Sequence, residues 1–349
     1  FPELSVCINN IVWPVLFNVF PIRGEEYRDP GGLLVGLDHI ATLGAEHLVG
    51  AHGPPISGTN TVLNEVLRSR DAIQFMWDQT VRGINKGLTL GELTEAVQLP
   101  DLYADSYLQT QFYGVVEHHV RQIHAGLRGW FDGDEATLFP VPPVERATKL
   151  VDGFGGAQAV RNKIAEANES NDIRWAIEMA TWLIRLESAG DDDRAQLADL
   201  LRVVARRTTA ANIRNWCLVR ARHLDGTADT NRFHAHRFSL AQVEQAPLSD
   251  VLATVRVMLN PMMCGDVDQQ LTIEVGDDRA GLHVRRGVAI PTAGSHDGLE
   301  LSTSTALWAA LMANKTGLTA ILAAPETEVS NRDSVSEFLS WFEHRSFHQ

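Results

Sequence analysis

Three successive stretches of this chain distribute their apolar residues in three different ways, and this succession limits the possible folds more than any other feature. Residues 1 to about 62 contain short apolar runs broken by glycine and proline. From about 62 to 225 the apolar residues recur with a helical period, and after about 238 apolar residues alternate with polar ones. A chain of 349 residues is too long for one ordinary core and suits two or three domains. We therefore expect a multidomain protein with α/β, all-α and α+β parts in this order.

The first stretch predicts part of an α/β layered domain. Apolar runs at 12–17 and 19–22 indicate buried strands or strand edges, 33–43 indicates a helix, and 47–50 indicates another short strand. Strand, helix and strand in this order are typical of such a domain.

The middle stretch predicts a bundle of helices. Its clearest apolar stripe, which has a helical period, consists of Trp175, Met179, Trp182, Leu183 and Leu186. Short polar turns separate one helical segment from the next. Tryptophans on such stripes are predicted to lie in a core or in an interface.

The last stretch predicts a small α+β domain around a hairpin. Leu271, Ile273 and Val275 alternate with polar residues, a polar turn follows at 276–278, and the alternation resumes at Leu282. Apolar segments that indicate helices flank this hairpin at 248–259, 306–312 and 334–342.

Composition argues against several classes of function. The formal net charge is −14, and non-specific nucleic-acid binding needs basic patches instead. An anionic substrate would need a local cationic pocket, because the field of the whole protein repels it. The sequence shows no apolar stretch long enough for a membrane span. The three cysteines, Cys7, Cys217 and Cys264, lack metal-binding spacing and are predicted to be buried core residues.

The start of the sequence is unusual for a complete protein. It begins with Phe1 rather than methionine, and no signal-peptide pattern follows. We expect a fragment or a processed product, so the sequence specifies no compartment.

Two residues that follow apolar runs are candidates for binding. His52 lies in the glycine- and proline-rich loop 50–55 at the end of a predicted strand, a favourable geometry for a metal ligand. The alternative is an ordinary turn histidine. Arg23 could hold a sulfate or phosphate through paired N–H donors, and the alternative is a salt bridge with a neighbouring carboxylate.

A run of histidines at His118, His119 and His124 looks like a metal cluster, but helical geometry separates the side chains. With 3.6 residues per turn, His118 and His119 point about 100° apart, and His124 lies roughly 120° on the other side of His118. Two metal ligands on one helix need a spacing of three or four residues. One of these histidines is a functional candidate, but all three cannot face one site. The glycines within 153–156 follow a helix-like segment, which excludes a dinucleotide-binding fingerprint.

Several motifs in the chain are long, specific and arranged in one order. They include WDQTVR at 77–82, YGV at 113–115 with His118, GWFDG at 129–133 and PVPPVE at 140–145. Shorter segments continue the series at 85–89, 99–100, 155–157, 172–176 and 214–215. In this order they resemble the motifs of alkyl sulfatases of the metallo-β-lactamase-related class, over nearly the whole chain.

This resemblance implies three parts and a reaction. Residues 1–90 would be the C-terminal part of a metallo-β-lactamase-like αββα domain, 91–230 a helical dimerisation domain, and 231–349 a sterol-carrier-protein-2-like (SCP-2-like) domain. The expected protein is a homodimer that hydrolyses small amphiphilic alkyl sulfate esters to an alcohol and sulfate. Two zinc ions would activate water and offset the developing charge.

The resemblance also assigns metal ligands. His52 matches a zinc-ligating histidine of the family, whereas the family's next histidine is replaced by Gly53. Asn10 stands where the family has a metal-binding glutamate, and a neutral amide is a poorer zinc ligand than a carboxylate. The HxHxDH zinc motif of the family, which holds most of the ligands, would lie before residue 1.

Three further residues receive roles on the sulfate side of the site. Arg23 matches a sulfate-binding arginine of the family. His118 matches a histidine of the helical domain and is assigned a catalytic contact with the leaving group or the sulfate. His119 takes the place of an asparagine and is assigned, with Arg23, to the sulfate.

Three functions remain open at this point. The first is an alkyl-sulfatase-like hydrolase. The second is a non-catalytic dimeric paralogue that binds amphiphiles or lipids through the SCP-2-like domain, and the departures at Asn10 and Gly53 favour it. The third is a hydrolase of a different ester, in which the altered anion pocket fits another group.

Overall fold

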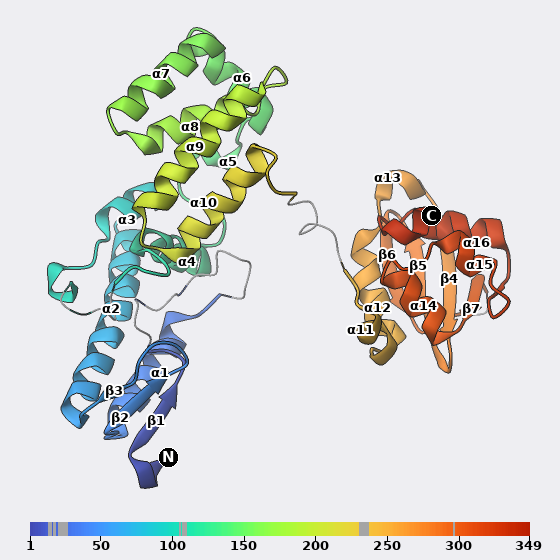
Figure 1. Cartoon of the computed structure of the whole chain (residues 1–349), viewed down its shortest axis with the longest axis horizontal. Helices are drawn as coiled ribbons and strands as arrows, with labels where there is room; N and C mark the ends of the chain where they lie inside the picture. The colour runs from blue at the N-terminus through green and yellow to red at the C-terminus, as the bar shows by residue number, and fades with distance from the viewer. Residues whose placement is uncertain are drawn as a thin grey trace. The chain divides into compact units, whose positions relative to one another are not determined.

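The computed structural model describes residues 1–12, 16, 19, 27–104, 106, 110–229, 237–295 and 297–349. It divides the chain into two compact units, Phe1–Thr230 and Asn231–Gln349 (Figure 1). The architecture is mixed α/β and rich in helix, which agrees with the predicted fold class at this level. In the described parts of the chain, no helix is long and apolar enough to cross a membrane.

The first unit begins with a small three-stranded sheet. Its strands β1 (Val6–Asn9), β2 (His47–Gly50) and β3 (Ile56–Ser57) lie in this order, with β1 parallel and β3 antiparallel to β2. Helix α1 (Pro30–Thr42) lies between β1 and β2 in sequence, and the Asp29 carboxylate caps it by accepting two backbone N–H groups of its first turn. Because β1 and β2 are parallel, their carboxyl ends meet at the same edge of the sheet.

The predicted strand at 47–50 is confirmed as β2, and the predicted helix at 33–43 is confirmed as α1. Strand β1 was not predicted. The predicted strands at 12–17 and 19–22 lie largely outside the described residues. Their described residues are buried, namely Val12, Leu16 and Val19.

Three further helices complete the first hydrophobic core. Helix α2 (Thr59–Asn85) is 27 residues long, and α3 (Leu90–Ala96) and α4 (Val116–Arg128) pack beside it. The buried side chains of this core come from the sheet and from all four helices, for example Leu37, Leu48, Met76, Leu93, Val120 and Ile123. The first core therefore joins the small sheet to α4.

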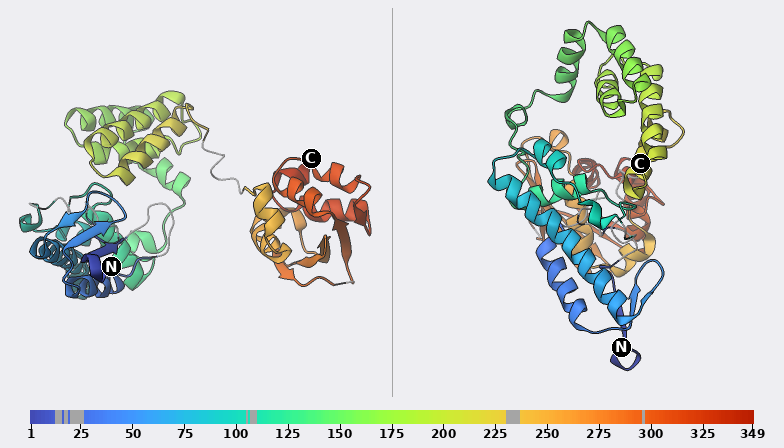
Figure 2. Two further views of the ribbon diagram at one scale, coloured as in Figure 1. Left: turned by 60° about the horizontal axis from the view of Figure 1, so that its bottom comes forward. Right: turned by 90° about the vertical axis from the view of Figure 1, so that its left-hand side faces the viewer.

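A second core in the same unit is purely helical, as the middle stretch predicts. Its helices are α6 (Pro143–Gly153), α7 (Ala157–Glu169), α8 (Ile173–Leu183), α9 (Asp191–Arg207) and α10 (Ala211–Leu224). The short helix α5 (Glu135–Leu138) lies between α4 and this bundle in sequence (Figure 2). The predicted stripe of Trp175, Met179 and Trp182 lies on α8.

The predicted positions of the tryptophans are confirmed for the stripe. The rings of Trp175 and Trp182 meet edge to face with centroids 5.3 Å apart, and Phe154 packs against both. Trp216 on α10 instead has 53% of its surface exposed. All three cysteines are free and buried, as predicted.

The second unit is built on a five-stranded sheet with the order β6-β5-β4-β7-β8. The strands are β4 (Asp268–Val275), β5 (Asp278–Arg285), β6 (Val288–Thr292), β7 (Leu299–Thr303) and β8 (Glu328–Val329). The predicted hairpin is confirmed as β4 and β5, which pair antiparallel. Gly276 opens its two-residue loop with a φ of 61°, a conformation that favours glycine.

Helices of the second unit pack on this sheet around one core. They are α11 (Leu240–Gln245), α12 (Leu248–Val255), α13 (Pro261–Cys264), α14 (Thr305–Met312), α15 (Leu318–Leu322) and α16 (Arg332–Ser340). Trp308, Phe338 and Phe342 are among its largest fully buried side chains. The predicted α+β character of this stretch is confirmed, with helices before and after the hairpin.

Candidate active site

Asn10 and His52 lie at one edge of the small sheet. The register pairs Asn9 with Gly50 at the carboxyl ends of the parallel strands β1 and β2. Asn10 follows β1 directly, and His52 is the second residue after β2. Both are exposed. The carboxyl edge of parallel strands is where α/β sheets usually bind ligands. The structure therefore brings together the two residues that the sequence assigns to a metal.

The side chain of Asn9 shapes this edge. Its Oδ1 accepts the backbone N–H groups of Ile11 at 2.9 Å and Val12 at 2.7 Å, so the chain turns sharply after β1. Its Nδ2 donates to a backbone carbonyl of β2 at 3.3 Å. A Cβ atom on Gly50 would lie 3.0 Å from the carbonyl oxygens of both Val12 and His52. Glycine at this position thus allows the two turns to pack closely.

A zinc pair does not fit the described residues by themselves. The described part of the chain contains no group of three or more His, Cys, Asp or Glu side chains that could hold a metal ion. His52 contributes one imidazole and Asn10 a neutral amide, whereas a stable zinc site needs about three or four ligands. Any zinc site at this edge needs ligands in addition to His52 and Asn10.

Helix α4 places His118 and His119 in different surroundings, as their angular separation predicts. The side chain of His119 is fully buried, and its Nδ1 accepts the N–H of Val19 at 3.4 Å. Burial lowers the pKa of His119 to about 3, so the ring is neutral and carries its proton on Nε2. His118 is half-buried, and burial lowers its pKa although the neighbouring Glu117 carboxylate opposes this shift. His124 is buried as well.

Glu117 joins α4 to the second helical bundle. Its carboxylate accepts a hydrogen bond from Nη2 of Arg174 on α8 at 2.8 Å and another from Nη2 of Arg121 at 3.2 Å. Burial of Glu117 would raise its pKa, but the two guanidinium groups outweigh burial and hold the pKa below its usual range. Sequence reasoning missed this contact, because 57 residues separate Glu117 from Arg174 and leave no local signal.

Tyr27 packs against α4 at Gly126. A Cβ atom on Gly126 would lie only 2.5 Å from Cζ of Tyr27, and burial raises the pKa of Tyr27 to about 12. Val19 contacts the same helix at His119. Arg23 lies outside the described residues, and the described residues on either side of it in sequence, Val19 and Tyr27, both contact α4.

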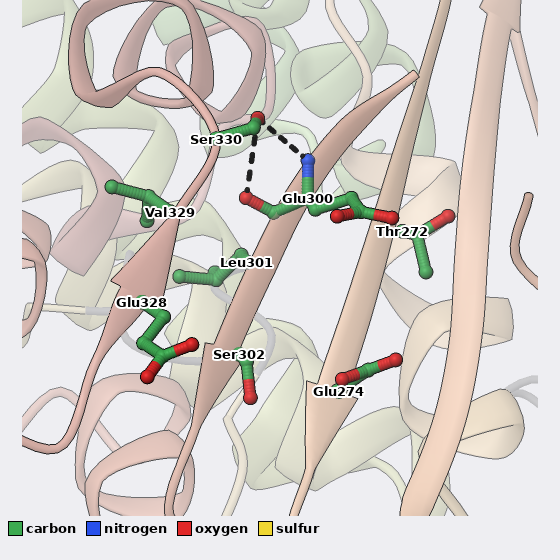
Figure 3. Close-up of a pocket in the computed structure, with 8 residues that line it drawn as sticks. All are labelled: Thr272, Glu274, Glu300, Leu301, Ser302, Glu328, Val329 and Ser330. Carbon is green, nitrogen blue, oxygen red and sulfur yellow. Dashed lines mark hydrogen bonds between the residues drawn. The ribbon is translucent and has the colours of Figure 1, made fainter. Parts of the chain in front are cut away.

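The second unit has an acidic pocket on its sheet. It has a volume of about 270 Å³, and Figure 3 shows Glu274, Glu300 and Glu328 among its lining residues on β4, β7 and β8. The Ser330 hydroxyl accepts the backbone N–H of Glu300 at 2.9 Å at its upper end. Three carboxylates repel an anionic group, so this pocket does not suit the head group of an alkyl sulfate.

A second pocket of this unit, between α11 and α12, has the opposite character. It has a volume of about 400 Å³, and its lining combines the apolar side chains of Phe238, Val243 and Val251 with two charged ones, Arg237 and Asp250. The apolar side chains suit an alkyl chain, whereas Asp250 offsets the charge that Arg237 would offer to an anionic head group.

Comparison with known proteins finds alkyl sulfatases among the relatives of this chain. Residues 89–227 match the protein family described as alkyl sulfatase dimerisation. The chain is 38% identical over 288 residues to a linear primary-alkylsulfatase of Pseudomonas sp., a match that covers 79% of this chain and 54% of that protein. It is also 27% identical over 241 residues to an alkyl/aryl-sulfatase of Saccharomyces cerevisiae, over 68% of this chain and 37% of that protein.

The fold agrees with this class. The solved structure of the stereoselective inverting sec-alkylsulfatase Pisa1 from Pseudomonas sp. superposes with a TM-score of 0.83 at 23% identity, over 98% of this chain and 55% of that chain. The chain thus spans about half the length of the relatives it matches. The predicted resemblance to alkyl sulfatases is confirmed over this part of those proteins.

Proposed function

We propose that this protein is an alkyl-sulfatase-type hydrolase that cleaves alkyl sulfate esters to an alcohol and sulfate. The observation that carries the proposal is the 38% identity to a linear primary-alkylsulfatase over 79% of the chain. The arrangement of the predicted site residues supports it, because Asn10 and His52 share one sheet edge. The zinc pair that the resemblance implies would draw on ligands in addition to these two.

Each predicted residue keeps a role in this proposal. His52 is a metal ligand, and Asn10 lies beside it at the position of a weak ligand. His119 is a neutral ring with its proton on Nε2, so it would hold a sulfate oxygen as a hydrogen-bond donor rather than as a cation, and this contact requires the buried ring to become accessible. Arg23 would supply the cationic contact with the sulfate. His118, whose pKa burial lowers, would contact the leaving-group oxygen or the sulfate as a neutral ring.

We also propose the division into 1–90, 91–230 and 231–349 as a metallo-β-lactamase-like part, a homodimerising helical part and an SCP-2-like part. The match at residues 89–227 supports the second part, and the boundary between the two compact units supports the third. The five-stranded sheet with its helices is compatible with a lipid-handling domain. The pocket beside Phe238, Val243 and Val251 would receive the alkyl chain.

A non-catalytic amphiphile-binding paralogue is the second candidate. It is favoured by the neutral amide of Asn10 at a position where a carboxylate would bind zinc better. It is also favoured by the apolar pocket near Arg237, which requires no metal.

Sulfate release from dodecyl sulfate separates the two candidates when it is measured beside zinc content. We expect turnover with bound zinc, and an at least about 100-fold loss of turnover in His52→Ala, since even the residues that only support metal ligands cost 10–100-fold. His39→Ala is the matched control, because His39 is an exposed histidine in the last turn of α1. A folded protein without zinc and without turnover, which still binds dodecyl sulfate, would leave the binding paralogue as the function.

A further inference from the structure

One segment of the first unit carries large apolar side chains that the cores of this unit do not cover. We call residues 129–144, which run from the end of α4 into the first turn of α6, the arm. The structure describes all of its residues, and none of them is buried. Trp130 is 75% exposed and Phe139 is 89% exposed, and Leu138, Val141 and Val144 are exposed as well. In the right-hand view of Figure 2, the arm runs from α4 to α6 apart from α9 and α10.

Local interactions hold the arm in shape. The backbone N–H of Leu90 donates to the carbonyl of Asp132 at 2.9 Å, and the Asp134 carboxylate caps α5 by accepting the N–H of Ala136 at 2.8 Å. Three prolines follow within 140–143 and fix the backbone φ angles there. The arm therefore presents its aromatic rings from a preorganised backbone, which lowers the conformational entropy lost on binding.

The outer face of α10 complements the arm in both polarity and charge. Trp216 and Val219 are exposed one turn apart on this helix, so they form one apolar surface. Helix α10 contains three arginines and no acidic residue, whereas the arm contains three acidic residues and no lysine or arginine. An acidic, aromatic segment and a basic, aromatic helix face attract each other and exclude water together.

We propose that two copies of this chain pair reciprocally, with the arm of each copy packed on the α10 face of the other. The inference rests on the proposed homodimer and names its contact surfaces. A second copy is the expected occupant because the arm and α10 both lie inside residues 89–227, the part that matches a dimerisation family. A two-fold axis makes such a contact twice, since every copy offers both surfaces.

A complementation experiment on the full 349-residue chain tests this pairing. The arm variant is Trp130→Ser with Phe139→Ser, and the α10 variant is Trp216→Ser with Val219→Ser. The matched control is Val257→Ser with Met262→Ser, which removes two exposed apolar side chains from the second unit. Dimer dissociation constants come from sedimentation velocity, and circular dichroism checks that every variant is folded.

We expect the native chain and the control to be dimers with equal dissociation constants. The arm variant and the α10 variant should each raise the dissociation constant by at least about 30-fold, the effect of losing one hot-spot residue worth about 2 kcal/mol. A mixture of the two variants should form mixed dimers at concentrations where neither variant associates alone, because one arm–α10 contact remains intact. A native monomer, variants that still dimerise, or a mixture that stays monomeric would each overturn the pairing.

Salt dependence provides a measurement that needs no substitution. The dissociation constant of the native dimer should rise between about 50 mM and about 500 mM NaCl, because screening weakens the acidic–basic contact. A dissociation constant that does not change or that falls as the salt concentration rises contradicts the pairing. Dodecyl sulfate hydrolysis is assayed separately, so a protein that hydrolyses the ester as a monomer refutes the pairing alone, and a dimer without turnover refutes the proposed hydrolase alone.

Discussion

Replacing Gly126 by alanine should detach the Tyr27 ring from α4. The new Cβ atom would lie 2.5, 2.7 and 2.9 Å from three atoms of this ring, about 1 Å inside the optimal contact distance of 3.5–4.0 Å. The ring as a whole has to move, which exposes one of its faces. Overpacking of this kind costs about 1–3 kcal/mol, and the gain in helix propensity from Gly to Ala offsets about 1 kcal/mol. We expect a net loss of stability of about 0–2 kcal/mol.

The matched control is Gly153→Ala on α6. It is also a helical glycine, and nothing lies within 4 Å of its ideal Cβ position. This variant should be unchanged or more stable by up to about 1 kcal/mol. The two alanine variants should therefore differ by about 1–3 kcal/mol, and the difference measures the steric conflict with Tyr27.

A double-mutant cycle with Tyr27→Ala isolates the contact. In this background Gly126→Ala meets no ring and should become as favourable as Gly153→Ala, which gives a coupling energy of about 1–3 kcal/mol. Urea unfolding gives the free energies, and hydrogen exchange on peptides of α4 and of the segment from Tyr27 onward locates the effect in the first unit. If Gly126→Ala and Gly153→Ala change the free energy of unfolding equally while Tyr27 is present, the Tyr27 ring does not pack on α4.

Three other perturbations have definite expected outcomes. Asp193→Asn should destabilise the second core by about 1–3 kcal/mol at neutral pH, because it breaks the charge-assisted pair between the buried Asp193 carboxylate and the partly exposed Arg161. This pair lowers the pKa of Asp193, so its contribution to the free energy of unfolding is present above pH about 4 and disappears as the pH falls through the folded-state pKa. Urea unfolding at several pH values measures this loss of stability. Thr89→Ala removes the capping box of α3 and should cost about 1 kcal/mol in the same assay. Glu117→Gln removes the charge that raises the pKa of His118, so the imidazole titration midpoint by NMR should move to lower pH.

The sequence predicts those parts of the fold that depend on local periodicity. The stripe on α8, the β4–β5 hairpin with Gly276 in its loop, and helix α1 are visible in windows of about ten residues. Strand β1 is different, because its identity as a strand depends on parallel pairing with β2, about forty residues away.

The features of the candidate site also divide into those that local sequence predicts and those that depend on distant parts of the chain. The sequence places His52 at a strand end and separates His118 from His119, since both conclusions follow from local geometry. The proximity of Asn10 and His52 depends on the register of two strands, and the contact between Glu117 and Arg174 depends on how α4 meets α8. No spacing along the chain encodes these distances, so only the folded arrangement reveals them.

Helix α4 connects these features, because it belongs to the first core, binds the second bundle through Glu117 and leads into the arm. One face of α4, with Val120 and Ile123, belongs to the first core. Near its start, Glu117 binds Arg174 of the second bundle, and at its end the chain continues directly into the arm. If a second copy holds the arm, α4 is restrained at its end as well as at its start and along its buried face. Reciprocal pairing would then fix the helix that carries His118 without any contact between the partner and the histidine itself.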